Sequence, residues 1–350
     1  MEINDILREY DLDTRLESMD VVEQNPWYWP LEKSLSHICK NLSRTPARFT
    51  FSKSREVQAY VLYQHNLVVM TTGMFDVLCR VAAKVVTSGA FIDFEGGVDP
   101  SWNPTRGFYS SSIALDISRT EFNWKLESQD WIKSGERQIL FLYLLQTLAN
   151  FVVLHELGHI HHNHGARFLT QNRSYMDVDL AESELLTPKE GIEAQAREVV
   201  ADGFALLRMQ NILEHDLTAK GHTKLMTLLA KKLLQGEEEK TRFLLTIVYL
   251  YFHMMDRHDW HRVNAFRLTH PPAPFRLKFL FGSTLERGMG SLQETDIADM
   301  LGKHHFACNA LVSLVYNHYP TLDMFAKVGE PHFNDLHNAI YYEIPKWLNI

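Results

Sequence analysis

The amino-acid sequence predicts an α+β fold that is predominantly helical and contains one small β-sheet. Apolar residues recur at helical spacing through much of the second half of the chain, from about residue 136 onward. An alternating, β-branched stretch at residues 58–70 is typical of paired strands. The chain is 350 residues long and 45% hydrophobic, which is ordinary for a protein that buries a core.

The first half of the chain supplies the predicted strands. The first fifty residues are expected to form a partly helical lead-in whose aromatic run at 27–30 packs onto the body. Residues 58–70 are rich in Val, Leu and Tyr and predict strands that pair around the turn-like 64–66. Residues 71–73 then end the strand, and the spacing of the apolar residues from Met74 to Ala82 predicts a helix.

A segment rich in Gly, Pro and aromatic residues, from 89 to about 134, predicts loops and short strands. It is interpreted equally as a flap over a site or as a surface insertion, because long loops occur in both roles. From Glu136 to His164 the apolar pattern predicts one long helix closed by Gly165.

The remaining elements are predicted to be helices separated by Gly and Pro. Their expected ranges are 188–213, 222–235, 240–257, a short helix after the Pro-rich 271–274, and 301–316. The expected organisation is a lead-in at 1–55, a core at 56–285 that carries the insertion at 89–134, and a helical extension at 286–350.

Charge and composition exclude several classes of protein. The net charge of −8 and a pI near 6.1 argue against nucleic-acid binding, which needs a basic surface. The N-terminal residues lack the basic flank and apolar core of a secretory signal, so a cytoplasmic location is expected. Three widely separated cysteines predict buried thiols and no disulfide framework. The apolar stretches 139–154 and 243–255 fall short of the ~20 residues of a membrane span and are interpreted as core helices.

The motif with the clearest chemistry is H-E-x-x-H, formed by His155, Glu156 and His159. On a helix the two histidines lie one turn apart on one face and can reach a single metal ion. Glu156 lies within about 100° of both, so its carboxylate can reach a water molecule at the metal without being a ligand. The motif therefore predicts a zinc site equipped for hydrolysis.

A catalytic zinc site needs a third protein ligand. The longer motif H-E-x-x-H-x-x-G-x-x-H fails because the chain has His162 and Gly165 in the opposite order. His162 and His164 remain nominal candidates, but with His161 they are interpreted as polar residues at a helix end, where the dipole and solvent suit them.

Glu198 is the favoured third ligand, because carboxylates on an otherwise apolar helix need a partner. Asp202 follows four residues later on the same face and is expected to accept a hydrogen bond from the far nitrogen of a ligand histidine. The alternative is an ordinary helix whose acids are exposed or paired with cations such as Arg197. Glu190 and Glu193 are weaker options, because acids are common near a helix start.

The combination H-E-L-G-H followed by E-x-x-A-D resembles the gluzincin metallopeptidases of the family that includes the CaaX prenyl endopeptidase and the HtpX-type heat-shock protease. Residues 67–78 resemble the strand and helix that precede the metal helix in that family. The run Thr269-His270-Pro271-Pro272, with Arg276 shortly after, resembles the family's T-H-P-P segment.

The resemblance implies a zincin-like fold with a small sheet whose edge strand flanks the active-site helix. It implies zinc bound by His155, His159 and Glu198, with Glu156 as general base and Asp202 in support. His270 is expected near the cleft, helping to hold an oxyanion, or else to be a packed turn residue. The strand Leu67, Val68, Val69 and Met70 is the expected edge along which a peptide pairs.

The chain departs from the family in its long insert and in lacking the membrane helices common there, so the substrates of the membrane members do not carry over. A weaker similarity, in size and motif, is to the Lit-type phage-exclusion peptidases. The expected function is a soluble Zn²⁺-dependent endopeptidase acting on a protein or peptide. The alternatives are a catalytically silent metal-binding regulatory protein on the same scaffold and a non-peptide amidohydrolase.

Overall fold

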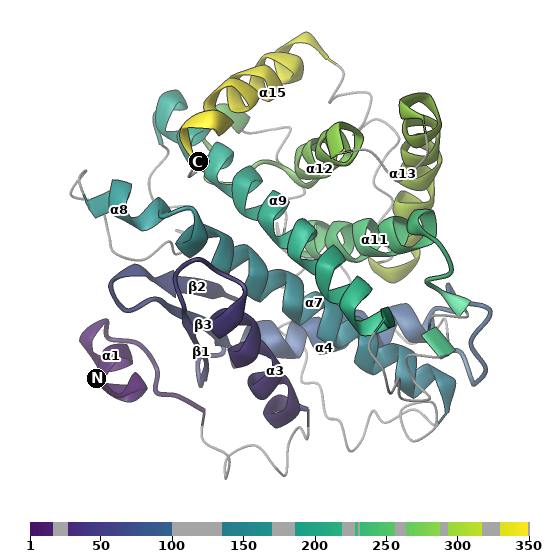
Figure 1. Cartoon of the computed structure of the whole chain (residues 1–350), viewed down its shortest axis with the longest axis horizontal. Helices are drawn as coiled ribbons and strands as arrows, with labels where there is room; N and C mark the ends of the chain where they lie inside the picture. Colours follow the sequence, from purple (N-terminus) through teal and green to yellow (C-terminus); the bar gives the residue numbers. More distant parts are fainter. Residues whose placement is uncertain are drawn as a thin grey trace.

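The computed structural model describes residues 1–16, 27–99, 135–169, 186–218, 228–229, 232–255, 264–287, 293–316 and 330–348. Within these ranges the protein is mostly helical and contains a small mixed sheet, which confirms the predicted fold class at that level. In Figure 1 the sheet lies on one side of the long helices α7 and α9, and the C-terminal helices lie on the other.

The sheet has three strands in the order β1-β3-β2: β1 (Arg48–Ser52), β2 (Ala59–Leu62) and β3 (Leu67–Thr71). β2 and β3 pair antiparallel, as expected for strands joined by a short connection. The connection is a 3-10 turn, η1 (Tyr63–His65), followed by Asn66 in the left-handed region at φ 46°, which Asn tolerates better than most residues. The predicted pairing around residues 64–66 is therefore confirmed.

The prediction that Leu67, Val68, Val69 and Met70 form an edge strand is wrong. β3 is the central strand: it pairs antiparallel with β2 on one side and parallel with β1 on the other, in the register Arg48↔Leu67 to Ser52↔Thr71. Its main-chain groups are therefore used on both sides. All five residues of the strand are buried, and a continuous apolar run of this kind is typical of a strand covered on both faces.

The outer strands are also covered. Residues 14–16 lie along β1, where Leu16 N–H donates to the Phe51 carbonyl and Lys53 N–H donates to that of Thr14. At the opposite edge of the sheet, Tyr60, Val61 and Leu62 of β2 are buried. Among the described residues, the sheet therefore offers little exposed edge for a peptide to pair with.

The described helices, with their bounds, are α1 (Ile3–Glu9), α3 (Tyr28–Asn41), α4 (Thr72–Thr87), α7 (Glu136–His161), α8 (His164–Leu169), α9 (Pro188–Thr218), α11 (Glu237–Met255), α12 (Ala273–Arg287), α13 (Glu294–Tyr316) and α15 (Pro331–Glu343). Two short 3-10 turns, η3 (Ala265–Arg267) and η4 (Ile344–Lys346), precede α12 and follow α15. The predicted helix is present as α4, which begins at Thr72, two residues before Met74, because the Thr71 side chain accepts a hydrogen bond from Met74 N–H and caps its first turn.

Several boundaries differ from the predictions. The helix predicted for 136–164 ends at His161, and a second short helix begins at His164 after a turn. α9 continues to Thr218, and α13 begins at Glu294 rather than at residue 301. Most of the predicted helix 222–235, and residues 100–134 of the predicted flap or insertion, lie outside the described residues.

Helix α7 forms the centre of the core. It is buried on almost every side and packs against α3, α4 and the sheet as well as α9 and α11. By length and composition it is the one described helix apolar enough to cross a membrane, and a buried core helix passes the same test. The predicted absence of a membrane span stays a prediction.

Candidate metal centre

Helices α7 and α9 bring His155, His159 and Glu198 together inside the protein. The two helices approach closely at Gly158, where a Cβ atom would lie only 3.0 Å from the Cα atom of Ala201. A larger residue at 158 would push α7 away from α9. It would thereby separate His155 and His159 from Glu198 and Asp202. The glycine inside the H-E-L-G-H run therefore lets a carboxylate on α9 reach imidazoles on α7.

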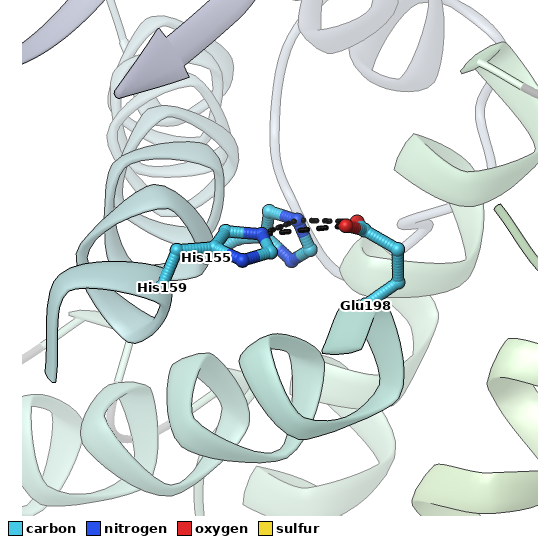
Figure 2. Close-up of side chains that lie close together, drawn as sticks. All are labelled: His155, His159 and Glu198. Atoms are coloured by element: carbon cyan, nitrogen blue, oxygen red, sulfur yellow. Dashed lines mark hydrogen bonds and ion pairs between the residues drawn. The ribbon is translucent and has the colours of Figure 1, made fainter. Parts of the chain in front are cut away.

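The three side chains point at one another from the two helices (Figure 2). His155 Nε2 lies 3.3 Å from His159 Nε2 and 3.0 Å from Glu198 Oε2, and His159 Nε2 lies 3.5 Å from Glu198 Oε1. Atoms bonded to one zinc ion at roughly 2.0–2.1 Å with tetrahedral angles lie about 3.3–3.4 Å apart. The spacing and the two-nitrogen, one-oxygen donor set fit such an ion, so this buried group could hold a metal.

The Nδ1 side of the His155 ring contacts the carboxylate of Asp202, which is paired with the guanidinium of Arg276. Asp202 Oδ1 lies 2.9 Å from His155 Nδ1, which is the contact that the four-residue spacing from Glu198 predicts. Arg276 donates to both oxygens of Asp202, from Nε at 2.8 Å and from Nη2 at 2.6 Å. A carboxylate held in this way accepts the Nδ1 proton, so Nε2 is the nitrogen of His155 that faces the centre and would be available to a metal ion.

The contacts within the group shift the pKa values of His155 and Glu198 in opposite directions. Burial by itself lowers the pKa of His155, but the hydrogen bonds to Asp202 and Glu198 outweigh it and raise the pKa to about 10. Burial acts against the charged form of Glu198, but the neighbouring His270 and His159 hold the pKa of its carboxyl well below the usual range. Both shifts favour an ionised Glu198 beside a protonated His155, which is a buried ion pair between the two helices.

Replacing Arg276 with Met is expected to destabilise the metal-free protein by about 3–5 kcal/mol, because it leaves the Asp202 carboxylate buried without its cation. The guanidinium also lies 4.1 Å from the ring centroid of Phe252, so its packing is lost too. Urea unfolding measures the change. Lys278→Met, a half-buried cation on the same helix, is the control and should change stability by less than about 1 kcal/mol. Equal losses in the two variants would contradict a specific role for the Arg276–Asp202 pair.

The segment before α12 brings His270 to the same group. His270 Nε2 lies 3.0 Å from Glu198 Oε2, and with a side chain 35% exposed it is the most exposed of the side chains that contact Glu198 here. The segment is tied to α9 by Gln195, whose Nε2 donates to the carbonyls of Ala265 and Leu268. It also packs directly on Gly191, where a Cβ atom would clash with the Phe266 carbonyl oxygen. The anchors on α9 therefore set where His270 meets Glu198.

The sequence interpretation missed the surroundings of His164. His161 and His162 are half-buried at the helix end, but His164 is 0% exposed, so the expectation of a solvated position is wrong for it. Its Nδ1 lies 2.9 Å from His159 Nδ1, and its Nε2 lies 3.1 Å from the main-chain oxygen of Trp347. His164 thus contacts His159, a candidate ligand, through the ring nitrogen that does not face His155 and Glu198.

The other candidates lie apart from the group. Glu190 accepts hydrogen bonds from Thr187 at the start of α9, and Glu193 is paired with Lys189 at 3.8 Å. Arg197 is buried with its guanidinium 5.3 Å from the ring centroid of Trp347. Glu156 follows His155 on α7 and is 8% exposed, next to the ligands in sequence but outside the three-atom cluster.

A scan against models of protein families finds no match, and neither curated proteins nor solved structures include a detectably similar chain. The site must therefore be interpreted from its own geometry and from the motifs.

Proposed function

We propose that this protein is a zinc-dependent hydrolase of the zincin type that cleaves peptide bonds. One observation carries the proposal: His155 and His159, on the helix that also bears Glu156, converge with Glu198 of α9 at tetrahedral spacing. A purely structural zinc site fills all four positions with protein ligands and needs no base, whereas a catalytic site keeps one position open. The three-ligand group beside a glutamate supports the catalytic interpretation.

Zinc held by these residues would supply a Lewis acid that polarises a substrate carbonyl and acidifies a water molecule. Glu156 would take a proton from that water and deliver it to the leaving amine. His270, at the more exposed side of the group, would donate a hydrogen bond to the oxyanion that develops on the substrate. Asp202 and Arg276 would hold His155 in the tautomer that binds metal.

A peptide is the proposed substrate because of the motif resemblance. The sheet gives this substrate less support than an exposed edge strand would have given. β3 is not an edge, and the outer strands are largely covered within the described residues. An extended peptide would therefore have to be held by side chains, not by strand pairing. This observation favours a second candidate, an amidohydrolase that acts on a smaller non-peptide amide with the same residues. A cytoplasmic location and the absence of a nucleic-acid partner remain part of the proposal.

The test is incubation of zinc-loaded protein with casein, a mixed peptide library and a panel of small acyl amides, with and without a chelator. We expect peptide cleavage that the chelator stops and added zinc restores. Cleavage of small amides alone would favour the second candidate. A protein that binds zinc stoichiometrically and cleaves neither class would be a metal-binding regulatory protein, and the proposal would fail.

A further inference from the structure

We infer that His164 and the main-chain carbonyl of Trp347 position His159 as a metal ligand, so that the C-terminal segment completes the metal centre. The inference rests on the metal site proposed above but not on peptidase activity. Three features carry it: the turn between α7 and α8, the direction of each hydrogen bond, and the way the C-terminal segment is held.

The turn brings His164 back to the helix that it follows. On a continuous helix, residues five apart point roughly 140° away from each other, so His159 and His164 would not meet. Here α7 ends at His161, and Asn163 adopts the left-handed conformation at φ 54°. α8 then begins at His164, and the turn places the His164 ring against the His159 ring, with the two Nδ1 atoms 2.9 Å apart.

The hydrogen-bond directions follow from the carbonyl. An amide oxygen only accepts, so the proton of His164 lies on Nε2, 3.1 Å from the Trp347 oxygen. His164 is completely buried and has no carboxylate among its hydrogen-bond partners within the described residues, so a neutral imidazole with its single proton on Nε2 fits both contacts, and Nδ1 keeps its lone pair. His159 must then donate from Nδ1, which leaves its Nε2 lone pair facing His155 and Glu198. This is the tautomer that binds metal.

The two ligand histidines are thus held by different means. His155 donates to a carboxylate that is itself paired with Arg276, whereas His159 donates to a neutral imidazole that is oriented by one main-chain carbonyl. The support of His155 comes from α9 and α12. The support of His159 comes from a residue near the end of the chain.

The C-terminal segment is packed well enough to hold that carbonyl in place. The Trp347 ring is buried, lies edge-on to His164 at 5.7 Å between ring centroids, and has the Arg197 guanidinium 5.3 Å from its centre. An apolar cluster joins α15 and η4 to α9 and α12; it consists of Ala196, Val199, Val200, Ala265, Phe275, Phe279, Phe333, Leu336, Ile340 and Trp347. In Figure 1 α15 accordingly lies near α9, and η4 contacts α9 as well.

The test measures metal affinity, by competition for Zn²⁺ against a chromophoric chelator, and the absorption spectrum of the Co²⁺-loaded protein. His164→Leu should weaken Zn²⁺ binding about 10–100-fold, the usual effect of losing the group behind a ligand histidine. His164→Asn should restore most of the affinity and the wild-type Co²⁺ spectrum. Its amide oxygen can accept from His159 while its NH₂ group donates to Trp347.

His304→Leu is the matched control. His304 is a buried histidine on α13 whose partners are Thr246 and Cys308, so its loss should leave Zn²⁺ affinity unchanged. If His164→Leu does not fold, His164→Ala replaces it, because Ala offers neither an acceptor to His159 nor a donor to the Trp347 carbonyl. Wild-type affinity in His164→Leu or its Ala replacement, or no better binding by Asn than by that variant, would overturn the inference. If the wild-type protein binds no metal, the proposed function itself fails, which is a different result.

Discussion

Glu156→Gln is expected to lower the rate of hydrolysis at least about 100-fold while the protein keeps its metal, because positioned proton transfer contributes about 10²–10⁴ in rate. Glutamine has almost the same shape as glutamate but cannot take a proton from water. Glu156 lies outside the three-atom cluster, so the ligands stay in place. The measurements are the initial rate on the substrate that shows chelator-sensitive cleavage and the zinc content of the same sample.

Glu193→Gln is the matched control for that experiment. Glu193 lies on α9, and its contact with Lys189 involves a largely exposed lysine, so losing the charge should leave both the rate and the zinc content unchanged. Full activity in Glu156→Gln would remove Glu156 from the role of base. Loss of zinc together with activity would instead indicate that Glu156 helps to bind the metal.

Glu198→Ala is expected to have the largest effect on metal binding. A carboxylate that is itself a ligand should matter more than a residue behind a ligand, so the loss of Zn²⁺ affinity should exceed about 100-fold. Glu198 contacts His155, His159 and His270, and removing it leaves the histidines without a shared anion. Zinc content after dialysis and the dissociation constant for Zn²⁺ measure the change.

Glu198→Gln separates charge from shape in this experiment. It fills the same space without the negative charge, and it should bind Zn²⁺ more weakly than the wild type. Glu193→Gln serves again as the control on α9. Undiminished zinc content in both Glu198 variants would exclude Glu198 as a ligand and point to Asp202 or His270, the nearest other metal-binding side chains.

The part of the site that could be predicted from the sequence is the part that lies within single helices. His155 and His159 are four residues apart, as are Glu198 and Asp202, and the helical period alone places each pair on one face. A catalytic zinc site needs a third protein ligand, and this requirement predicts that Glu198 on one helix meets the two histidines on the other. His270 was suggested by a motif resemblance, and its contact with Glu198 depends on Gln195 and Gly191, which carried no recognisable signal.

The sequence by itself determined the predominantly helical α+β class, the pairing of β2 with β3, and the candidate ligands, because these follow from periodicity and short-range turns. Only the tertiary structure decided that β3 is central, that Arg276 stands behind Asp202, and that His164 connects His159 to Trp347. The last of these contacts joins residues 183 positions apart. Such pairs form only when the packing of α7, α9, α12 and α15 brings them together, and no local pattern of residues records that packing.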